Sequence, residues 1–177
     1  MSDPAITLSI VSHRQNVLVN QLLEDLQRHC RTPIRIVLTQ NVADEIDFSP
    51  AAAEVIVNPS PKGFGANHNA AFRRCTTDIF CVLNPDIRLA ADPFPALREA
   101  LARPQVAAAG PLVLDAGGRP EDSARRFPTL LSLLRKAVAG KTGPEYPFDQ
   151  GAQRVDWVAG MCIAFRSAAF AQAGGFD

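Results

Sequence analysis

The chain opens with apolar runs separated by an amphipathic stretch, and this alternation restricts its fold more than any other feature. Residues 6–11 form an apolar, β-branched run, and residues 34–38 form a second one. Between them, leucines recur at helical spacing from Leu18 to Leu26. We expect this helix to end near Pro33, because the residue before a proline is pushed out of the α region. Strand, helix and strand in this order predict a parallel β-α-β unit.

The alternation continues along most of the chain. The expected strands are 54–57, 79–83, 106–114 and 158–165, and the expected helices are 67–74, 95–102 and a last one that follows Ser167, a candidate N-cap, up to Gly174. Strands that alternate with helices predict an α/β fold with a mostly parallel sheet flanked by helices.

Residues 118–154 interrupt this pattern. They are rich in Pro, Gly, Arg and Glu, and they contain one apolar helical stretch at 130–138. We expect an excursion from the sheet that is a candidate substrate loop. At 177 residues, the chain is still expected to form a single domain, 1–177.

Composition and charge exclude several classes of function. The 18 basic residues balance 18 acidic ones, so no overall field attracts nucleic acid, and we expect no nucleic-acid partner. The four cysteines form no CxxC pair and have no metal-ligand spacing with the three histidines. Buried reduced thiols are therefore expected rather than a zinc site or a disulfide framework.

The N-terminus and the hydropathy bear on location. The first residues lack a basic segment followed by an apolar one, and no apolar run approaches the roughly 20 residues that a membrane span needs. We expect a cytoplasmic protein, and peripheral association with the inner face of the membrane stays open.

Polar loops follow the expected strands at the edge where open α/β sheets bind ligands. One of them, K-G-F-G-A-N-H-N at 62–69, joins glycines that permit close backbone approach to a helix start whose free amides favour anions. This combination suits a phosphate-bearing ligand. The order matches neither a P-loop nor the dinucleotide-binding fingerprint, so a plain turn is the alternative for G-F-G alone.

A second loop carries a candidate metal ligand. Asn84, Pro85 and Asp86 follow a fully apolar strand and place an amide oxygen and a carboxylate two residues apart. Such oxygens hold hard divalent cations against a diphosphate, and a simple Pro-Asp turn is the alternative. Lys62, the glycines and this carboxylate belong to loops at one sheet edge, which favours a single binding cleft.

Several longer segments keep a distinctive order and spacing. They are I-V-S-H-R at 10–14, N-P-S-P-K-G-F-G-A-N-H-N-A-A-F at 58–72, V-L-N-P-D-I at 82–87, R-R-F-P-T-L at 125–130, V-D-W-V-A-G-M-C-I-A-F-R at 155–166 and G-G-F-D at 174–177. Together they resemble the inverting glycosyltransferase family 2, which has the Rossmann-like GT-A fold, and particularly its bacterial rhamnosyltransferase-like members. The resemblance covers nearly the whole chain.

This resemblance implies a metal-dependent inverting glycosyltransferase of polysaccharide biosynthesis at the cell surface. The implied donor is a nucleoside-diphosphate sugar of the dTDP or UDP type, with rhamnose as one candidate, and the acceptor is a saccharide or a lipid-linked molecule. The implied nucleotide-sugar-binding residues are Ser12, His13, Asn41, Lys62, Gly63, Phe64, Gly65, Asn69, Asn84, Asp86, Trp157 and Gly160.

The resemblance also implies roles within this set. Ser12, His13 and Asn41 would lie beside the base, and residues 62–69 would line the pocket. Asn84-Pro85-Asp86 would stand for the DxD motif, with Asp86 as the ligand of Mg²⁺ or Mn²⁺. Because asparagine replaces the first acidic residue, metal affinity without nucleotide should be low.

The remaining implied contacts have structural alternatives. Trp157 and Gly160 would lie near the donor sugar and the acceptor, where an indole can stack on a sugar face, and an ordinary core role for Trp157 is the alternative. Arg125 and Arg126 could pair with phosphates, or they could belong to a solvated basic turn.

One expected element of the family is missing. Its catalytic base is an acidic residue shortly after G-G-F-D, the chain stops at Asp177, and neither Asp156 nor Asp177 matches the position of the base. A positioned carboxylate typically contributes about 10² to 10⁴ in rate. We therefore expect a C-terminally truncated member, and the alternative to a transferase is a fragment that binds a nucleotide sugar without turnover. A nucleotidyltransferase or another Rossmann-like module would need a glycine-rich loop at the first strand, where Ser12 and His13 stand.

Overall fold

A computed structural model describes residues 5–49, 53–121, 123–127, 146–147 and 151–177 of the chain. The chain divides into two compact units. The first comprises Met1–Ala109 with Gly160–Asp177, and the second comprises Gly110–Ala159. The helical stretch expected at 130–138 lies outside the described residues, and the expectation of one domain stays a prediction.

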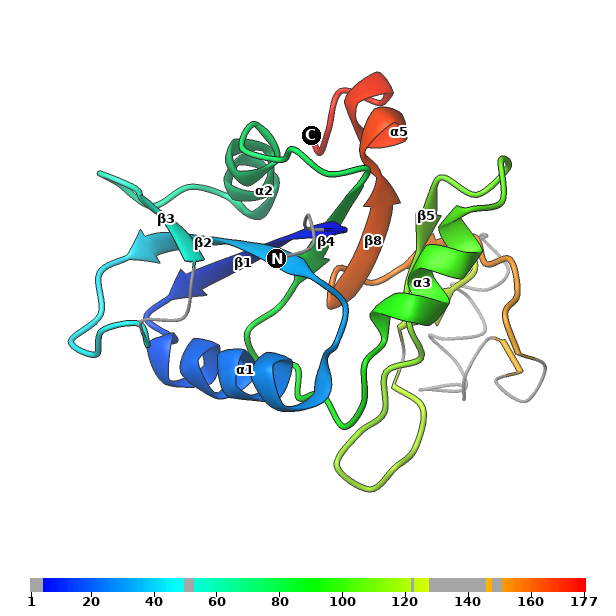
Figure 1. The fold of residues 1–177 in the computed structure, drawn as a ribbon, viewed down its shortest axis with the longest axis horizontal. Helices are drawn as coiled ribbons and strands as arrows, with labels where there is room; N and C mark the ends of the chain where they lie inside the picture. The colour runs from blue at the N-terminus through cyan, green and yellow to red at the C-terminus, as the bar shows by residue number, and fades with distance from the viewer. Residues whose placement is uncertain (1–4, 50–52, 122, 128–145, 148–150) are drawn as a thin grey trace, which may run out of the picture. The chain divides into compact units, whose positions relative to one another are not determined.

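The described residues of the first unit form a six-stranded sheet in the order β3-β2-β1-β4-β8-β5 (Figure 1). The strands are β1 (Ile6–His13), β2 (Ile34–Val42), β3 (Ala53–Val57), β4 (Ile79–Leu83), β5 (Ala108–Ala109) and β8 (Cys162–Arg166). The four strands β1 to β4 are parallel, whereas β8 runs antiparallel to both β4 and β5. The predicted α/β fold with a mostly parallel sheet flanked by helices is therefore confirmed.

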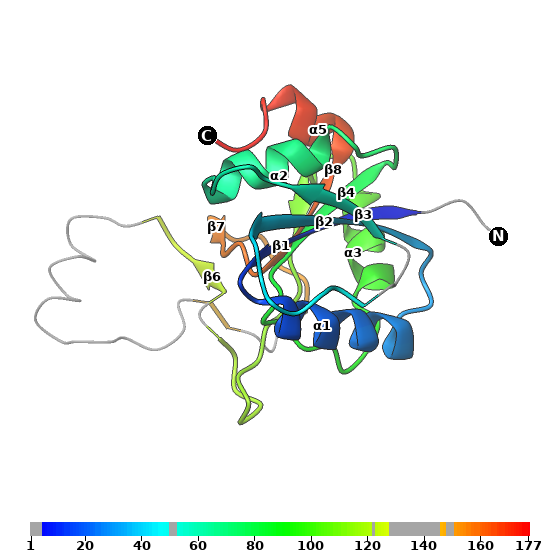
Figure 2. The same cartoon turned by 90° about the vertical axis from the view of Figure 1, so that its left-hand side faces the viewer.

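Helices cover both faces of this sheet, as Figures 1 and 2 show. They are α1 (Asn16–His29), α2 (Phe64–Phe72), α3 (Phe94–Leu101) and α5 (Ser167–Gln172). One core joins Leu22 of α1 and Phe94 of α3 to the strands, and a second joins Ala71 of α2 and Phe170 of α5 to Phe80. Within the described residues, no helix has the length and hydropathy needed to cross a membrane.

Several expected elements differ from the structure. The strand expected at 106–114 is reduced to β5, and Leu112 and Leu114 beyond it are exposed. Ser167 is not an N-cap, because α5 begins at this residue and its hydroxyl donates to the carbonyl oxygen of Thr77 at 2.7 Å.

The second unit holds a short hairpin-like pair in its described part, β6 (Ala124–Arg125) with β7 (Trp157–Val158), which are antiparallel. The strand expected at 158–165 is thus divided between β7 here and β8 of the first unit. A turn is present at 115–118, since Asp115 Oδ1 accepts from the backbone N–H of Gly117 at 2.8 Å and Gly118 has a φ of 75°.

Two of the four cysteines are buried as expected, whereas Cys30 and Cys75 are partly exposed. All four cysteines lie in the described residues and are free, and Cys81 and Cys162 are buried. Burial raises the pKa of Cys30 to about 12, and the hydrogen bond with Cys162, together with burial, raises the pKa of Cys81. Both thiols therefore stay protonated near neutral pH, as expected for reduced core cysteines.

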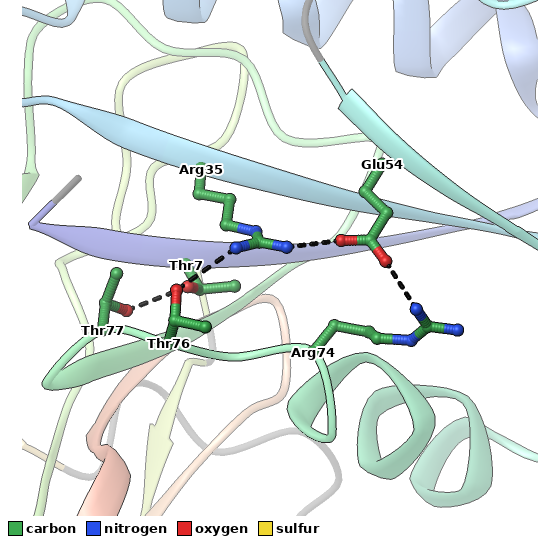
Figure 3. A network of polar contacts seen from close by, with 6 residues as sticks. All are labelled: Thr7, Arg35, Glu54, Arg74, Thr76 and Thr77. Carbon is green, nitrogen blue, oxygen red and sulfur yellow. Dashed lines mark hydrogen bonds and ion pairs between the residues drawn. The ribbon is translucent and has the colours of Figure 1, made fainter. Parts of the chain in front are cut away.

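A polar cluster ties the N-terminal ends of the strands together (Figure 3). Arg35 of β2 donates to Glu54 of β3 at 2.6 Å and to Thr76 Oγ1 at 3.2 Å, and Arg74 donates to the same carboxylate at 3.0 Å. These side chains are about a third exposed or more, so each pair contributes only about 0.2 to 1 kcal/mol. The cluster fixes the end of the sheet opposite to the loops discussed below.

Candidate functional site

A cavity of about 260 Å³ lies at the C-terminal ends of β1, β2 and β4, which are neighbours in the sheet. Its lining residues all belong to the first unit and are Val11, His13, Gln15, Asn41, Lys62, Phe64, Asn67, His68, Asn84, Pro85 and Asp86. This is the edge at which parallel α/β sheets bind ligands. Six of the predicted site residues lie here together: His13, Asn41, Lys62, Phe64, Asn84 and Asp86.

The turn between β1 and α1 aims two side chains into this cavity. Arg14 adopts a φ of 59°, a left-handed conformation that costs a residue with a side chain on the order of 1 to 3 kcal/mol. His13 before it and Gln15 after it both line the cavity. Ser12 does not: it is fully buried, and its hydroxyl donates to Asn16 Oδ1 and accepts from the N–H of Gln15. Its expected contact with a base stays a prediction.

Asn41 is the centre of a saturated hydrogen-bond network. Its Oδ1 accepts from Asn58 Nδ2 and from the backbone N–H of Lys62, both at 2.8 Å. Its Nδ2 donates to the carbonyl oxygen of Lys62 at 3.0 Å and to His13 Nδ1 at 3.1 Å. The side chain is only 4% exposed. Because a primary amide has two donors and two acceptor sites, this one has none left for a ligand.

The network binds both the backbone N–H and the backbone carbonyl oxygen of Lys62. Asn67 Nδ2 also donates to the Lys62 carbonyl at 3.1 Å, and Asn58 Nδ2 donates to Asn67 Oδ1 at 2.7 Å. The Lys62 side chain lines the cavity and forms no ion pair with any described residue. The loop therefore presents an ammonium group whose attachment point is fixed by buried amides.

The N-terminus of α2 follows this lysine directly. Gly63 is the flanking residue, it is exposed, and no side chain in the described part of the chain caps the helix there. A Cβ added to Gly63 would meet no described atom within 4 Å. The first amide groups of α2 thus have no side-chain cap among the described residues, an arrangement that favours an anion.

Gly65 and Asn69 contact the last described residues of the chain, and their expected contact with a ligand stays a prediction. A Cβ on Gly65 would lie 2.7 Å from the carbonyl oxygen of Asp177. Asn69 Nδ2 donates to the carbonyl oxygen of Phe176 at 2.8 Å, and Asn69 Oδ1 accepts from the N–H of Phe176 at 3.0 Å. Gly175, with a φ of 85°, passes so close to Asn69 that no Cβ would fit. Neither Gly65 nor Asn69 lines the cavity, and both hold residues 174–177 against α2.

Phe64 forms an apolar wall. Its side chain is 48% exposed, lines the cavity and packs edge-on against His68 with ring centroids 4.3 Å apart. A Cβ on Gly160 would lie 3.0 Å from the Phe64 ring, so the glycine makes room for this ring rather than lining the cavity itself.

His68 is a buried imidazole at the cavity. It is 1% exposed, and its Nδ1 is 2.8 Å from Ser9 Oγ of β1. Its Nε2 is buried without a hydrogen-bond partner among the described residues. Burial lowers the pKa of His68 to about 4, so the ring is neutral near pH 7.

Asn84, Pro85 and Asp86 form the opposite wall. The N–H of Asn84 donates to the carbonyl oxygen of Met161 at 2.9 Å, and the Asn84 carbonyl accepts from the N–H of Ile87 at 3.3 Å. All three residues of the motif line the cavity, and Asp86 is exposed. The predicted juxtaposition of Lys62 and Asp86 around one cavity is therefore what the structure shows.

The chain just beyond Asp86 is clamped to α1. Arg88 donates from Nε to Asp25 Oδ2 at 2.6 Å and from its second terminal nitrogen to Oδ1 at 2.9 Å, and the N–H of Leu89 donates to Asp25 Oδ2 at 3.1 Å. The carboxylate of Asp25 is only 5% exposed. The hydrogen bond from Arg88 lowers the pKa of Asp25 to about 2.

The donor set of this wall suits a divalent cation only in part. Among the described residues, no group of three or more His, Cys, Asp or Glu side chains is arranged to hold a metal ion. Asp86 supplies one carboxylate and Asn84 one amide oxygen, both hard donors that suit Mg²⁺ or Mn²⁺. The remaining oxygens would have to come from water and a bound diphosphate, which fits the expected low affinity for metal alone.

Trp157 belongs to the second unit. Its side chain is 45% exposed, so it is not an ordinary core residue. It pairs across β6 and β7 with Arg125, whose guanidinium carbon lies 5.4 Å from the indole centroid. Arg126 lies at 5.3 Å from the ring of Tyr146. These cation-π contacts stabilise side-chain positions in this unit, and the expected sugar contact of Trp157 stays a prediction.

Gln15 is the polar lining residue that the prediction left out, whereas Asn67 and His68 fell within the predicted range 62–69 without being named as binding residues. The helix α2 begins at Phe64 rather than at 67, so positions 64, 67 and 68 share one helical face, and the correct helix start would have identified the latter two. The placement of Gln15 at the cavity depends on the left-handed conformation of Arg14. No local sequence pattern indicates this conformation, because Arg14 is not a glycine.

Comparison with known proteins gives concordant matches. A family model described as glycosyl transferase family 2 matches residues 38–171. The N-acetylglucosaminyl-diphospho-decaprenol L-rhamnosyltransferase of two Mycobacterium tuberculosis strains is 34% identical over 110 residues. This match covers 56% of the chain but 36% of the relative, so the chain corresponds to a minor part of that protein.

Solved structures show the same fold. The mannosyltransferase PcManGT of Pyrobaculum calidifontis, in complex with GDP-Man and Mn²⁺, superposes with a TM-score of 0.65 at 17% identity and covers 100% of the chain and 48% of its own length. S. aureus TarS 1-349 in complex with UDP has a TM-score of 0.60 at 11% identity, with 96% of the chain and 48% of that protein covered. At these identities the likeness concerns the fold alone.

Proposed function

Because the chain belongs to glycosyl transferase family 2, we propose that its cavity binds a nucleoside-diphosphate sugar and that the protein transfers this sugar to an acceptor hydroxyl. The observation that carries the proposal is the pairing of two walls around one cavity. Lys62 and the open N-terminus of α2 form the anion-binding wall, and Asp86 with Asn84 forms the cation-binding wall. A diphosphate with a bound cation requires the anion-binding wall as well as the cation-binding wall.

Different residues of the cavity would contact different parts of the ligand. Lys62 and the first amides of α2 would hold phosphate oxygens, and His13 and Gln15 would face the nucleoside. Phe64 supplies an apolar surface and helps to exclude water. Asp86 and Asn84 would hold Mg²⁺ or Mn²⁺, which when bound balances the negative charge that develops on the diphosphate leaving group.

The donor and acceptor follow from the relatives. We infer a pyrimidine nucleotide sugar of the dTDP or UDP type, with rhamnose as the first candidate, since the curated relative is named a rhamnosyltransferase. Its named acceptor is lipid-linked, so a saccharide or lipid-linked acceptor used in cell-surface polysaccharide synthesis is proposed here. Such an acceptor would place the protein in the cytoplasm at the inner face of the membrane.

A second function, binding without turnover, is favoured by one observation. Transfer requires a group that accepts the proton of the acceptor hydroxyl. Asp86 is the one carboxylate among the described residues that line the cavity, and it is assigned to the cation. These residues therefore account for donor binding more fully than for proton removal.

Calorimetric titration tests the donor site. We expect dTDP and UDP sugars to bind more tightly with Mn²⁺ than without it, and Asp86→Asn to abolish this difference. Glu54→Gln, the same chemical change at the opposite end of the sheet, should keep it. Metal-dependent binding that survives in Asp86→Asn would refute the assignment. Release of the nucleoside diphosphate over time in the presence of acceptor then separates transfer from binding alone.

A further inference from the structure

The amide of Asn41 has a fixed orientation. The two partners that define its orientation are backbone groups of fixed polarity. The N–H of Lys62 can only donate, so the atom that it meets at 2.8 Å is Oδ1. The carbonyl of Lys62 can only accept, so the atom that it meets at 3.0 Å is Nδ2.

This orientation determines the proton position on His13. Nδ2 of Asn41 directs its second N–H at His13 Nδ1, 3.1 Å away. Nδ1 must therefore accept, and the proton of the neutral ring lies on Nε2. His13 is exposed and lines the cavity, so Nε2–H is the polar group that the ring offers to a ligand.

We propose that Asn41 is a positioning residue that holds His13 in the Nε2–H tautomer, and that this N–H donates to a carbonyl oxygen of the pyrimidine base. Asn41 itself is buried and saturated, so it acts through His13 rather than on the base. The identity of the ligand rests on the proposed function, whereas the tautomer does not. The site thereby selects a base that presents an acceptor to His13.

Replacement of Asn41 by aspartate places an acceptor oxygen where the Asn41 N–H donates to His13 Nδ1. A carboxylate can still accept from Asn58 and from the Lys62 N–H, but it cannot donate to His13 Nδ1. His13 would then carry a proton on Nδ1, as the other tautomer or as the imidazolium. In the neutral form, Nε2 becomes an acceptor that repels a base carbonyl.

Nitrogen NMR of ¹⁵N-histidine-labelled protein reads the tautomer directly. We expect the wild-type chain to show His13 protonated at Nε2 only, and Asn41→Asp to show a proton at Nδ1. Asn20→Asp is the matched control, since Asn20 makes comparable side-chain contacts with Asp47 and Ser49 and does not line the cavity. A proton on Nδ1 in the wild type, or an unchanged tautomer in Asn41→Asp, would overturn the proposal.

Nucleotide titration tests the consequence. Asn41→Asp should weaken UDP binding by about tenfold, the size expected for one lost hydrogen bond. In a His13→Gln background, the glutamine amide donates without any tautomer, so the same Asn41→Asp change should have a clearly smaller effect. Equal effects in both backgrounds would show that Asn41 acts only through the Lys62 loop. If the wild type binds no nucleotide, the proposed function fails while the NMR result still decides the tautomer.

Discussion

The clamp between Asp25 and Arg88 permits a quantitative prediction. Asp25→Asn keeps the shape of the side chain but removes the charge and places an NH₂ group against a guanidinium or backbone donor. The pKa of Asp25 falls from 3.8 to about 2 on folding, and each unit corresponds to about 1.4 kcal/mol. Because the Arg88 side chain is 56% exposed, solvent screening reduces the effect, and we expect a loss of about 1 to 2 kcal/mol at pH 7.

The sign of the pH dependence follows from the direction of this shift. A carboxyl group whose pKa is lower in the folded state contributes its full stability above the unfolded value of 3.8 and loses it as the pH falls towards 2. The difference between wild type and Asp25→Asn should therefore be constant from pH 7 to pH 5. It should fall to about half by pH 3.

Urea denaturation monitored by circular dichroism at pH 7, 5 and 3 measures this difference. Glu54→Gln is the control, because Glu54 also faces two arginines but is 31% exposed, and the loss of its two solvent-screened pairs should cost less than the loss of the buried Asp25 carboxylate. A cost for Asp25→Asn no greater than that of Glu54→Gln, or one that persists undiminished at pH 3, would refute the reasoning. We also expect weaker Mn²⁺-dependent nucleotide binding, since the clamp holds the chain two residues beyond Asp86.

Two further predictions concern α2. Gly65→Ala should destabilise the fold by about 1 to 3 kcal/mol, because its Cβ would lie 2.7 Å from the Asp177 carbonyl, whereas Gly63→Ala meets no described atom and should be nearly neutral in thermal denaturation. His68, with a pKa lowered to about 4, contributes stability above pH 6.5 that is lost as the pH falls towards 4, so wild type should lose about 2 kcal/mol between pH 7 and 5. His68→Met should lack this loss in urea denaturation, and an identical pH slope in both proteins would contradict the assignment.

The sheet could be predicted from the sequence because its strands carry their own pattern. The apolar-rich runs at 6–11, 34–38 and 79–83 all belong to central strands, where burial on both faces favours apolar residues and makes the runs easy to recognise. The strand β5 could not be placed, because only two of its residues pair with β8 while the apolar pattern runs on into exposed positions. Ser167 resembled an N-cap, but a distant carbonyl provides a better partner for its hydroxyl.

The positions of several site residues could be predicted from the sequence, whereas the contacts that they make could not. Loops that follow parallel strands meet at one edge, so Lys62 and Asp86 could be assigned to one cleft from their place in the sequence. The role of Asn41 depends on hydrogen bonds with residues 13, 58 and 62, which no local pattern reveals. The contact of Gly65 with Phe176 and Asp177 likewise could not be predicted, because these residues are distant from it in the sequence.

The attachment of residues 110–159 has an evolutionary consequence. The chain leaves the first unit after Ala109 and returns at Gly160, and the strands on either side of this departure pair directly, with Ala109 opposite Ala164. The ends of the excursion are thus held by the sheet, and each doubling of its length costs only about 0.6 kcal/mol in closure entropy. Selection can lengthen, shorten or exchange this insert while the fold that carries Lys62 and Asp86 is left intact. Differences in length between related chains are therefore expected to fall between Ala109 and Gly160 rather than within the sheet.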